Sequence, residues 1–97
     1  MQYTVILSPE ETGYSVFCPA FHIASQGDSR DEALSMIVAA MEGWIEGELE
    51  DGRDVPLETL GAIAEEIVEV LRFRDEEGLP PIIETTQVTV RSRAAAA

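Results

Sequence analysis

The stretch CPAFHIASQGDSRDEAL, residues 18–34, leads from an apolar strand into the start of a helix. Pro19 has no N–H to donate, so strand pairing should break there. Gly27 permits the turn that follows. Ser29 and Glu32 have the S-x-x-E spacing of a capping box, which predicts that a helix begins at this point. We interpret the stretch as a strand-to-helix corner whose polar residues serve local structure.

Strands precede this corner, and two helices and a last strand follow it. Short runs of β-branched and aromatic residues predict the strands. Apolar residues at three- and four-residue spacing predict the helices. The predicted ranges in chain order are 2–8, 14–18 and about 22–26 for the first three strands, 29 to about 47–52 and 57–77 for the helices, and 86–91 for the last strand.

The order β-β-β-α-α-β indicates an α+β fold, an antiparallel sheet with helices on one face. A chain of 97 residues is long enough for one small domain. We expect this domain to span 1–93 and to be followed by a frayed tail over 94–97.

The charge of the chain is strongly negative. Nineteen acidic side chains stand against six basic ones, which gives a net charge of −13. Such a field repels phosphate and anionic membranes and attracts basic partners, although solubility alone explains it equally well. The single cysteine fits a reducing compartment, and the sequence has no apolar stretch long enough to span a membrane. We therefore expect a cytoplasmic protein that binds neither membranes nor free nucleic acid.

The motifs of the first fifty residues match a known pattern: a hairpin, a Cys-Pro after its second strand, and a Gly-Asp-Thr/Ser-x-x-Glu-Ala helix start. Here the hairpin is YTVILSPEETGYSVFCPAF, and SQGDSRDEAL leads into the helix. This part of the chain resembles the HicB family of antitoxins from type II toxin–antitoxin pairs. The resemblance implies a partial RNase H-like fold without nuclease activity. It also implies a small basic HicA-type toxin, an mRNA interferase, as the partner whose active site is covered.

Two departures from the family pattern leave an alternative open. Many members carry a further DNA-binding segment, whereas six residues follow Arg91, so we expect no direct DNA binding by this chain alone. The helix predicted over 57–77 is longer than the usual link. The alternative is an orphan HicB-like domain that acts as an oligomeric protein-interaction module without a toxin partner. A homo-oligomer suits both interpretations.

A catalytic or metal-binding role finds little support in the residues. Cys18 precedes a proline among apolar neighbours, where a free cysteine is usually a small buried hydrophobe. His22 is the one histidine, and a structural zinc site needs four ligands. The predicted strands carry no Asp or Glu, which argues against two-metal hydrolysis. We expect no enzyme activity, no cofactor and no metal.

The strand-to-helix corner and one helix position supply the candidate contacts to a partner. Trp44 is more simply a core residue, but a large aromatic near a helix end can also anchor an interface. The candidate partner-binding residues are Phe21, His22, Gln26, Asp28 and Trp44.

Overall fold

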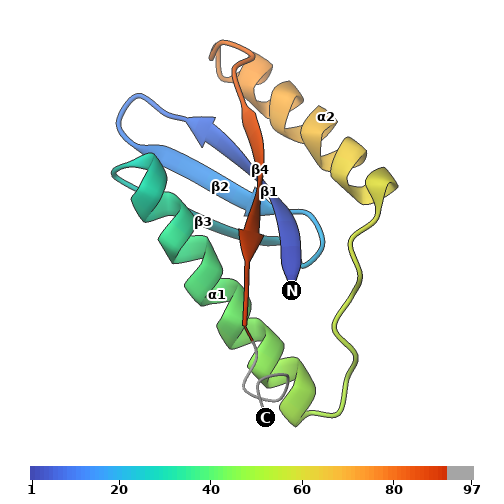
Figure 1. Ribbon diagram of the computed structural model, residues 1–97. Coiled ribbons are helices and arrows are strands. Elements are labelled where there is room, and N and C mark those ends of the chain that lie inside the picture. Colours follow the sequence, from blue (N-terminus) through green and yellow to red (C-terminus); the bar gives the residue numbers. More distant parts are fainter. Residues whose placement is uncertain (92–97) are drawn as a thin grey trace.

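The computed structural model describes residues 1–91, so the tail predicted over 94–97 lies outside the described residues. Four strands are present: β1 (Gln2–Pro9), β2 (Tyr14–Cys18), β3 (Ile23–Gly27) and β4 (Glu84–Thr89). Two helices, α1 (Arg30–Glu50) and α2 (Leu60–Glu76), lie between β3 and β4 in the chain. The strands form one antiparallel sheet in the order β3-β2-β1-β4 (Figure 1). The predicted α+β class and element order are confirmed, and the RNase H-like likeness stays a prediction.

One face of the sheet packs against α1 and forms the main core. Successive side chains of a strand point to opposite faces. Leu7 lies opposite Val16, and Tyr3 lies opposite Val88, so these side chains share one face. Val90 is buried with them, as predicted for the returning strand. The apolar stripe of α1 completes this core with four fully buried residues, Ala33, Ile37, Met41 and Ile45.

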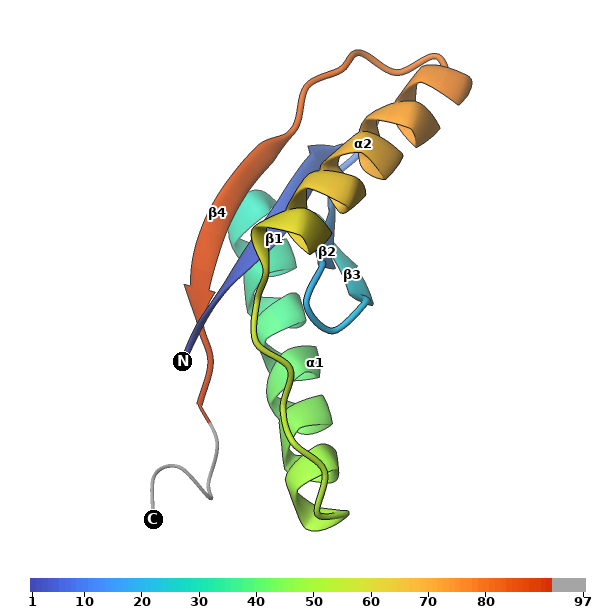
Figure 2. The same cartoon turned by 90° about the vertical axis from the view of Figure 1, so that its right-hand side faces the viewer.

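The second helix lies over the opposite face, so the prediction that both helices cover one face is wrong. Beneath α2 lie Ile6 and Phe17, whose positions alternate with those of the core residues Leu7 and Val16. Figure 2 shows α2 passing over the strands on the side away from α1. Because α1 already covers the apolar face, the remaining helix packs on the few apolar side chains of the other face.

The strand-to-helix corner has the capping geometry that the sequence predicts. The Ser29 hydroxyl accepts a hydrogen bond from the Glu32 N–H at 3.1 Å. The Glu32 carboxylate accepts one from the Asp28 N–H at 3.2 Å, one residue before the usual partner in a capping box. The N–H groups of Asp28 and Glu32 are thus satisfied locally, and these hydrogen bonds hold the start of α1 at the end of β3.

Both ends of α2 are tied to the sheet. Before the helix, the Thr4 N–H of β1 donates to the Glu58 carboxylate. β2 pairs with β1 only over Ile6–Pro9, so it does not reach Thr4. At the other end, Arg74 is 2% exposed. Its guanidinium donates to the backbone oxygens of Pro9 at 2.9 Å and Pro80 at 2.7 Å. Gly78, with φ of 72°, ends the helix as predicted.

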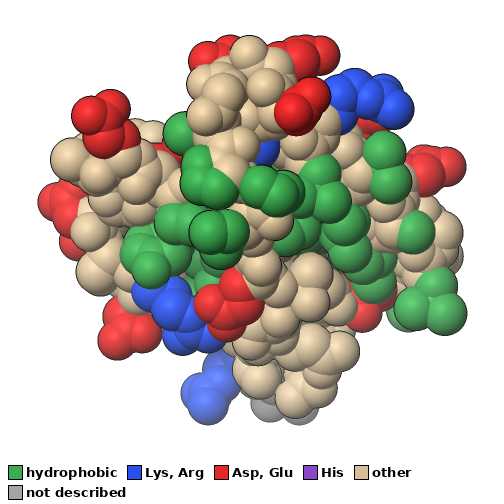
Figure 3. All heavy atoms as spheres, turned by 90° about the horizontal axis from the view of Figure 1, so that it is seen from above, with side chains coloured by type: hydrophobic (Ala, Val, Ile, Leu, Met, Phe, Trp, Pro, Cys, Tyr) green, Lys and Arg blue, Asp and Glu red, His purple; other side chains and the backbone are tan. Residues whose placement is uncertain are grey.

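Large hydrophobic side chains stay exposed on α2 and on the segments that flank it. Seen from above, hydrophobic side chains form a band across the molecule, with acidic side chains around it (Figure 3). The exposed large hydrophobic residues of α2 and its flanking segments are Leu57, Leu60, Val68, Phe73 and Ile82. Neither helix of the described residues is long and apolar enough to cross a membrane.

Candidate functional site

The predicted partner-binding aromatics lie together inside the fold. Phe21 stacks on Trp44 with ring centroids 4.6 Å apart, and Tyr3 lies on the other side of Phe21 at the same centroid distance. Phe21 is 7% exposed and belongs to the main core, against which Trp44 packs. The three rings connect β1, the β2–β3 turn and α1, so their first role is to hold these elements together.

The three polar candidates lie at two other places. Gln26 and Asp28 line a polar pocket of about 500 Å³ between the β1–β2 turn and the start of α1. His22 lies at the opposite end of β3, in the left-handed region with φ of 55°. Its Nε2 atom is 3.8 Å from the Glu66 carboxylate of α2, and its ring meets Phe17 edge-on at 5.7 Å. The structure therefore does not bring the five predicted residues into one site.

The one cysteine is a core residue. Cys18 is fully buried at the end of β2. Burial raises the pKa of its thiol above the ordinary value, and hydrogen bonds from the backbone of Phe21 and Ala20 offset this only in part. A raised pKa disfavours the thiolate, which is the nucleophilic form. Within the described residues, no three His, Cys, Asp or Glu side chains are grouped so as to hold a metal ion.

We expect Cys18 to be alkylated by iodoacetamide at least about 100-fold more slowly in the folded protein than in urea, because the reagent must await unfolding. The neutral thiol contributes stability below its ordinary pKa of 9.0, and this contribution is lost as the pH rises above that value. Mass spectrometry of timed samples at pH 8 measures the rate of Cys18 alkylation with and without urea. Equal rates with and without urea would contradict the burial of Cys18.

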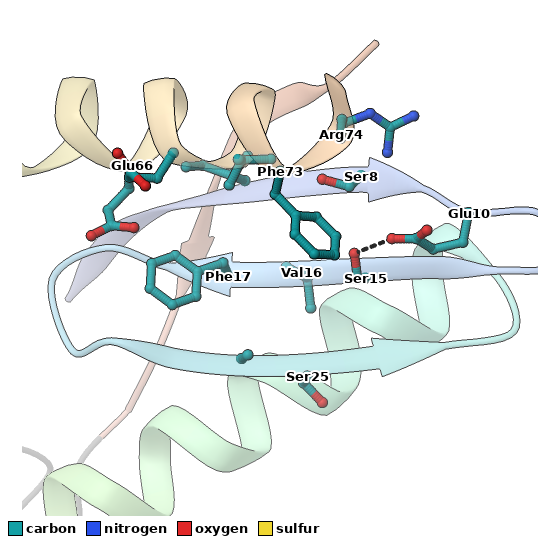
Figure 4. A pocket seen from close by; sticks show the side chains of 13 residues that line it. Ser8, Glu10, Ser15, Val16, Phe17, Ser25, Glu66, Phe73 and Arg74 are labelled. Carbon is teal, nitrogen blue, oxygen red and sulfur yellow. Dashed lines mark hydrogen bonds between the residues drawn. The ribbon is translucent and has the colours of Figure 1, made fainter. Parts of the chain in front are cut away.

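A groove lies between α2 and the second face of the sheet. It encloses about 240 Å³, and we call it the α2 groove. Its apolar lining comes from the sheet and from α2, and Phe73 points from the helix toward the strands (Figure 4). The residues that line it are Ile6, Ser8, Glu10, Ser15, Val16, Phe17, Ala24, Ser25, Glu66, Glu69, Val70, Phe73 and Arg74.

Acidic groups surround the apolar lining of the α2 groove. Glu66 lies at the Phe17 end, and Glu10 lies at the other end, where it accepts a hydrogen bond from the Ser15 hydroxyl at 2.7 Å (Figure 4). Glu69 also lines the groove. Arg74 is the basic residue among the lining side chains, but its guanidinium is directed to backbone oxygens. The groove thus presents negative charge around an aromatic lining.

The sequence did not predict the α2 groove. Phe73 lies beside the apolar stripe of its helix rather than on it, and it is 56% exposed. A phenylalanine off the stripe of an otherwise acidic helix was the available signal. From the sequence Phe17 is simply a strand residue, so only the tertiary structure shows that it lines the same groove as Phe73.

Two similar curated proteins place the chain in a family. The UPF0150 protein ssr1765 of Synechocystis sp. is 42% identical over 60 residues, which cover 60% of this chain and 76% of that protein. Antitoxin HicB 1 of Photorhabdus laumondii subsp. laumondii is 40% identical over 72 residues, which cover 72% of this chain. The chain belongs to the UPF0150 and HicB-like family. No protein-family model matches it.

The HicB-like resemblance inferred from the hairpin and the corner is thereby confirmed. The match to antitoxin HicB 1 spans 45% of that protein's length. The match to antitoxin HicB 1 therefore shows common ancestry over the part of that protein that this chain covers.

Proposed function

We propose that the chain is an antitoxin-like binding protein that neutralises a small basic HicA-type mRNA interferase by covering its active site. The observation that carries the proposal is the 40% identity to antitoxin HicB 1 over 72% of the chain. The function is binding without catalysis, which agrees with a buried cysteine of raised pKa. The setting is the cytoplasm, where such a toxin meets mRNA.

The charge of the chain suits this role. An RNA-cleaving protein must attract phosphates and therefore carries basic groups near its active site. A protein with a net charge of −13 is drawn to the same groups. Complementary charge speeds association and aligns the two proteins, while apolar contacts supply much of the lifetime of the complex. Occlusion of the active site then needs no chemistry from the antitoxin.

Co-purification tests the proposal. The tagged chain is co-expressed with the product of each neighbouring gene, and bound proteins are identified after washing at moderate salt. The proposal predicts that a small basic protein with RNA-cleaving activity stays bound to the chain. Recovery of the chain without any such protein, from cells that express it, would contradict the antitoxin function.

A second candidate is an oligomeric interaction module without a toxin. The exposed hydrophobic side chains of α2 and its flanks, among them Val68 and Ile82, favour this alternative. Burial of such a band against a second copy would stabilise a small domain. In the same co-purification experiment this alternative predicts that the chain elutes alone, as a defined homo-oligomer. The antitoxin proposal is compatible with a homo-oligomer but requires the basic protein as well.

A further inference from the structure

We propose that the α2 groove is the surface that receives the basic partner, and that one apolar side chain of the partner enters it with a Lys or Arg beside that side chain. The inference rests on the proposed function, because it names where that partner binds. It also places the partner on the face of the sheet that α2 covers, away from the predicted contacts Phe21, Gln26 and Asp28.

The volume of the α2 groove favours a protein side chain as its occupant. Pockets for small molecules and cofactors typically enclose about 300–1,000 Å³. The α2 groove encloses about 240 Å³, and it is open to solvent beside Phe73. A cavity of this size takes a protein side chain more readily than a cofactor. Interfaces commonly use such pockets to hold a central anchor residue.

The lining of the groove suits an apolar anchor. Phe17 and Phe73 come from the sheet and from the helix, and Val70 lies with them in the lining. Phe73 is 56% exposed, so a large aromatic surface is open to a partner at the mouth of the groove. A partner side chain placed against Phe73 would remove this exposed surface from water. Aromatic faces also attract Lys and Arg, which a basic partner supplies.

The negative charge around the α2 groove favours a partner with a positively charged side chain. Glu10, Glu66 and Glu69 line it, and Glu10 accepts a hydrogen bond from the Ser15 hydroxyl. Glu66 is 3.8 Å from His22, which is charged only when protonated. Glu69 pairs with Arg72 at 2.8 Å, but both side chains are well exposed, and such pairs contribute little to stability. A cation of the partner can therefore take over these carboxylates.

The groove is held open before the partner arrives. The buried Arg74 joins α2 to the backbone at Pro9 and Pro80, and the residues before the helix are tied to β1 through Glu58. These contacts lie at the two ends of the helix, so the aromatic lining between them stays accessible. A preformed site lowers the ordering cost of binding.

Two pairs of matched variants test the inference. Glu66→Gln with Glu69→Gln removes two charges from the groove, and Glu65→Gln with Glu76→Gln removes two charges from exposed positions of the same helix outside its lining. Both pairs change the net charge equally, so they weaken long-range attraction alike. Phe73→Ser removes the exposed aromatic, and its control is Val68→Ser, which is 51% exposed on the same helix.

The readout is the dissociation constant between the full chain and the small basic protein recovered by co-purification, measured by calorimetry at physiological salt. We expect the groove pair and Phe73→Ser to weaken binding by at least about tenfold, and both controls by less than about threefold. Equal loss in groove and control variants, or no loss in either, would overturn the inference while leaving the antitoxin function in place. If the unaltered chain binds no such protein, the proposed function fails, and this inference fails with it.

Discussion

Replacement of Ile37 by alanine is expected to lower the free energy of unfolding by about 2–5 kcal/mol. Ile37 is fully buried in the middle of α1, in the main core between this helix and the sheet. The loss has two parts, the apolar surface no longer buried and the cavity that remains. A domain of this size has a total stability of about 5–15 kcal/mol, so the variant should be far less stable than the parent.

Urea denaturation followed by circular dichroism measures this loss. Met36 supplies the control, because it precedes Ile37 on the same helix and is 50% exposed. Met36→Ala should change stability by no more than about 0.5 kcal/mol. If Ile37→Ala were as stable as Met36→Ala, the packing of α1 on the apolar face of the sheet would be wrong.

Replacement of Gly27 by alanine should disrupt the strand-to-helix corner. A Cβ atom at this position would lie 2.4 Å from the Ala33 nitrogen and 2.8 Å from the Glu32 carbonyl carbon. Both atoms belong to the backbone of α1, so they cannot move aside without shifting the start of the helix. We expect a loss of about 3 kcal/mol in the free energy of unfolding, at the upper end of the usual cost of overpacking.

Gly43 provides a matched control for this variant. It lies inside α1, and a Cβ atom added there would meet nothing within 4 Å. Gly43→Ala should therefore raise stability by about 0.5–1 kcal/mol, because alanine favours the helix. The two substitutions are chemically identical and opposite in expected sign. Thermal unfolding of both variants measures the difference, and a Gly27→Ala variant as stable as Gly43→Ala would contradict the close approach at the corner.

The secondary structure was largely predictable from the sequence because its signals are local. The corner at Ser29 and the end of α2 at Gly78 both depend on residues within a single turn of helix. The strands were found because β-branched runs lie between clear breaks.

Most predicted boundaries lie within one residue of the observed ones. β4 spans Glu84–Thr89 rather than 86–91, so it includes the acidic Glu84, contrary to the prediction of strands without acids. The structure also places the start of α2 at Leu60 rather than near 57. Thr59 caps the helix there, and an apolar stripe alone does not reveal its cap.

The packing of α2 was not predictable in the same way. Periodicity identifies a helix with an apolar side, but it does not say which face of a sheet the helix covers. Arg74 is buried and donates to two backbone oxygens, and one of these, the oxygen of Pro9, lies 65 residues away in the sequence. The α2 groove depends on this placement, and so it could be seen only in the tertiary structure.

For the candidate site residues too, the sequence indicated single positions and the tertiary structure showed their surroundings. Phe21 was chosen for its place in the strand-to-helix corner and Trp44 as a large aromatic near a helix end, and the structure places both rings in one cluster with Tyr3. His22 is the predicted residue nearest the α2 groove, through its contacts with Phe17 and Glu66. Residue type marked positions of interest, but only the fold shows which of them share a surface.

An RNA-cleavage assay tests whether the chain neutralises an RNA-cleaving partner. The small basic protein that co-purifies with the chain is incubated with mRNA while the purified chain is added in increasing amounts. If the chain is an antitoxin, cleavage falls in proportion to the added chain and stops once each toxin molecule is bound. Undiminished cleavage in the presence of excess chain would contradict the claim that this protein neutralises an RNA-cleaving partner.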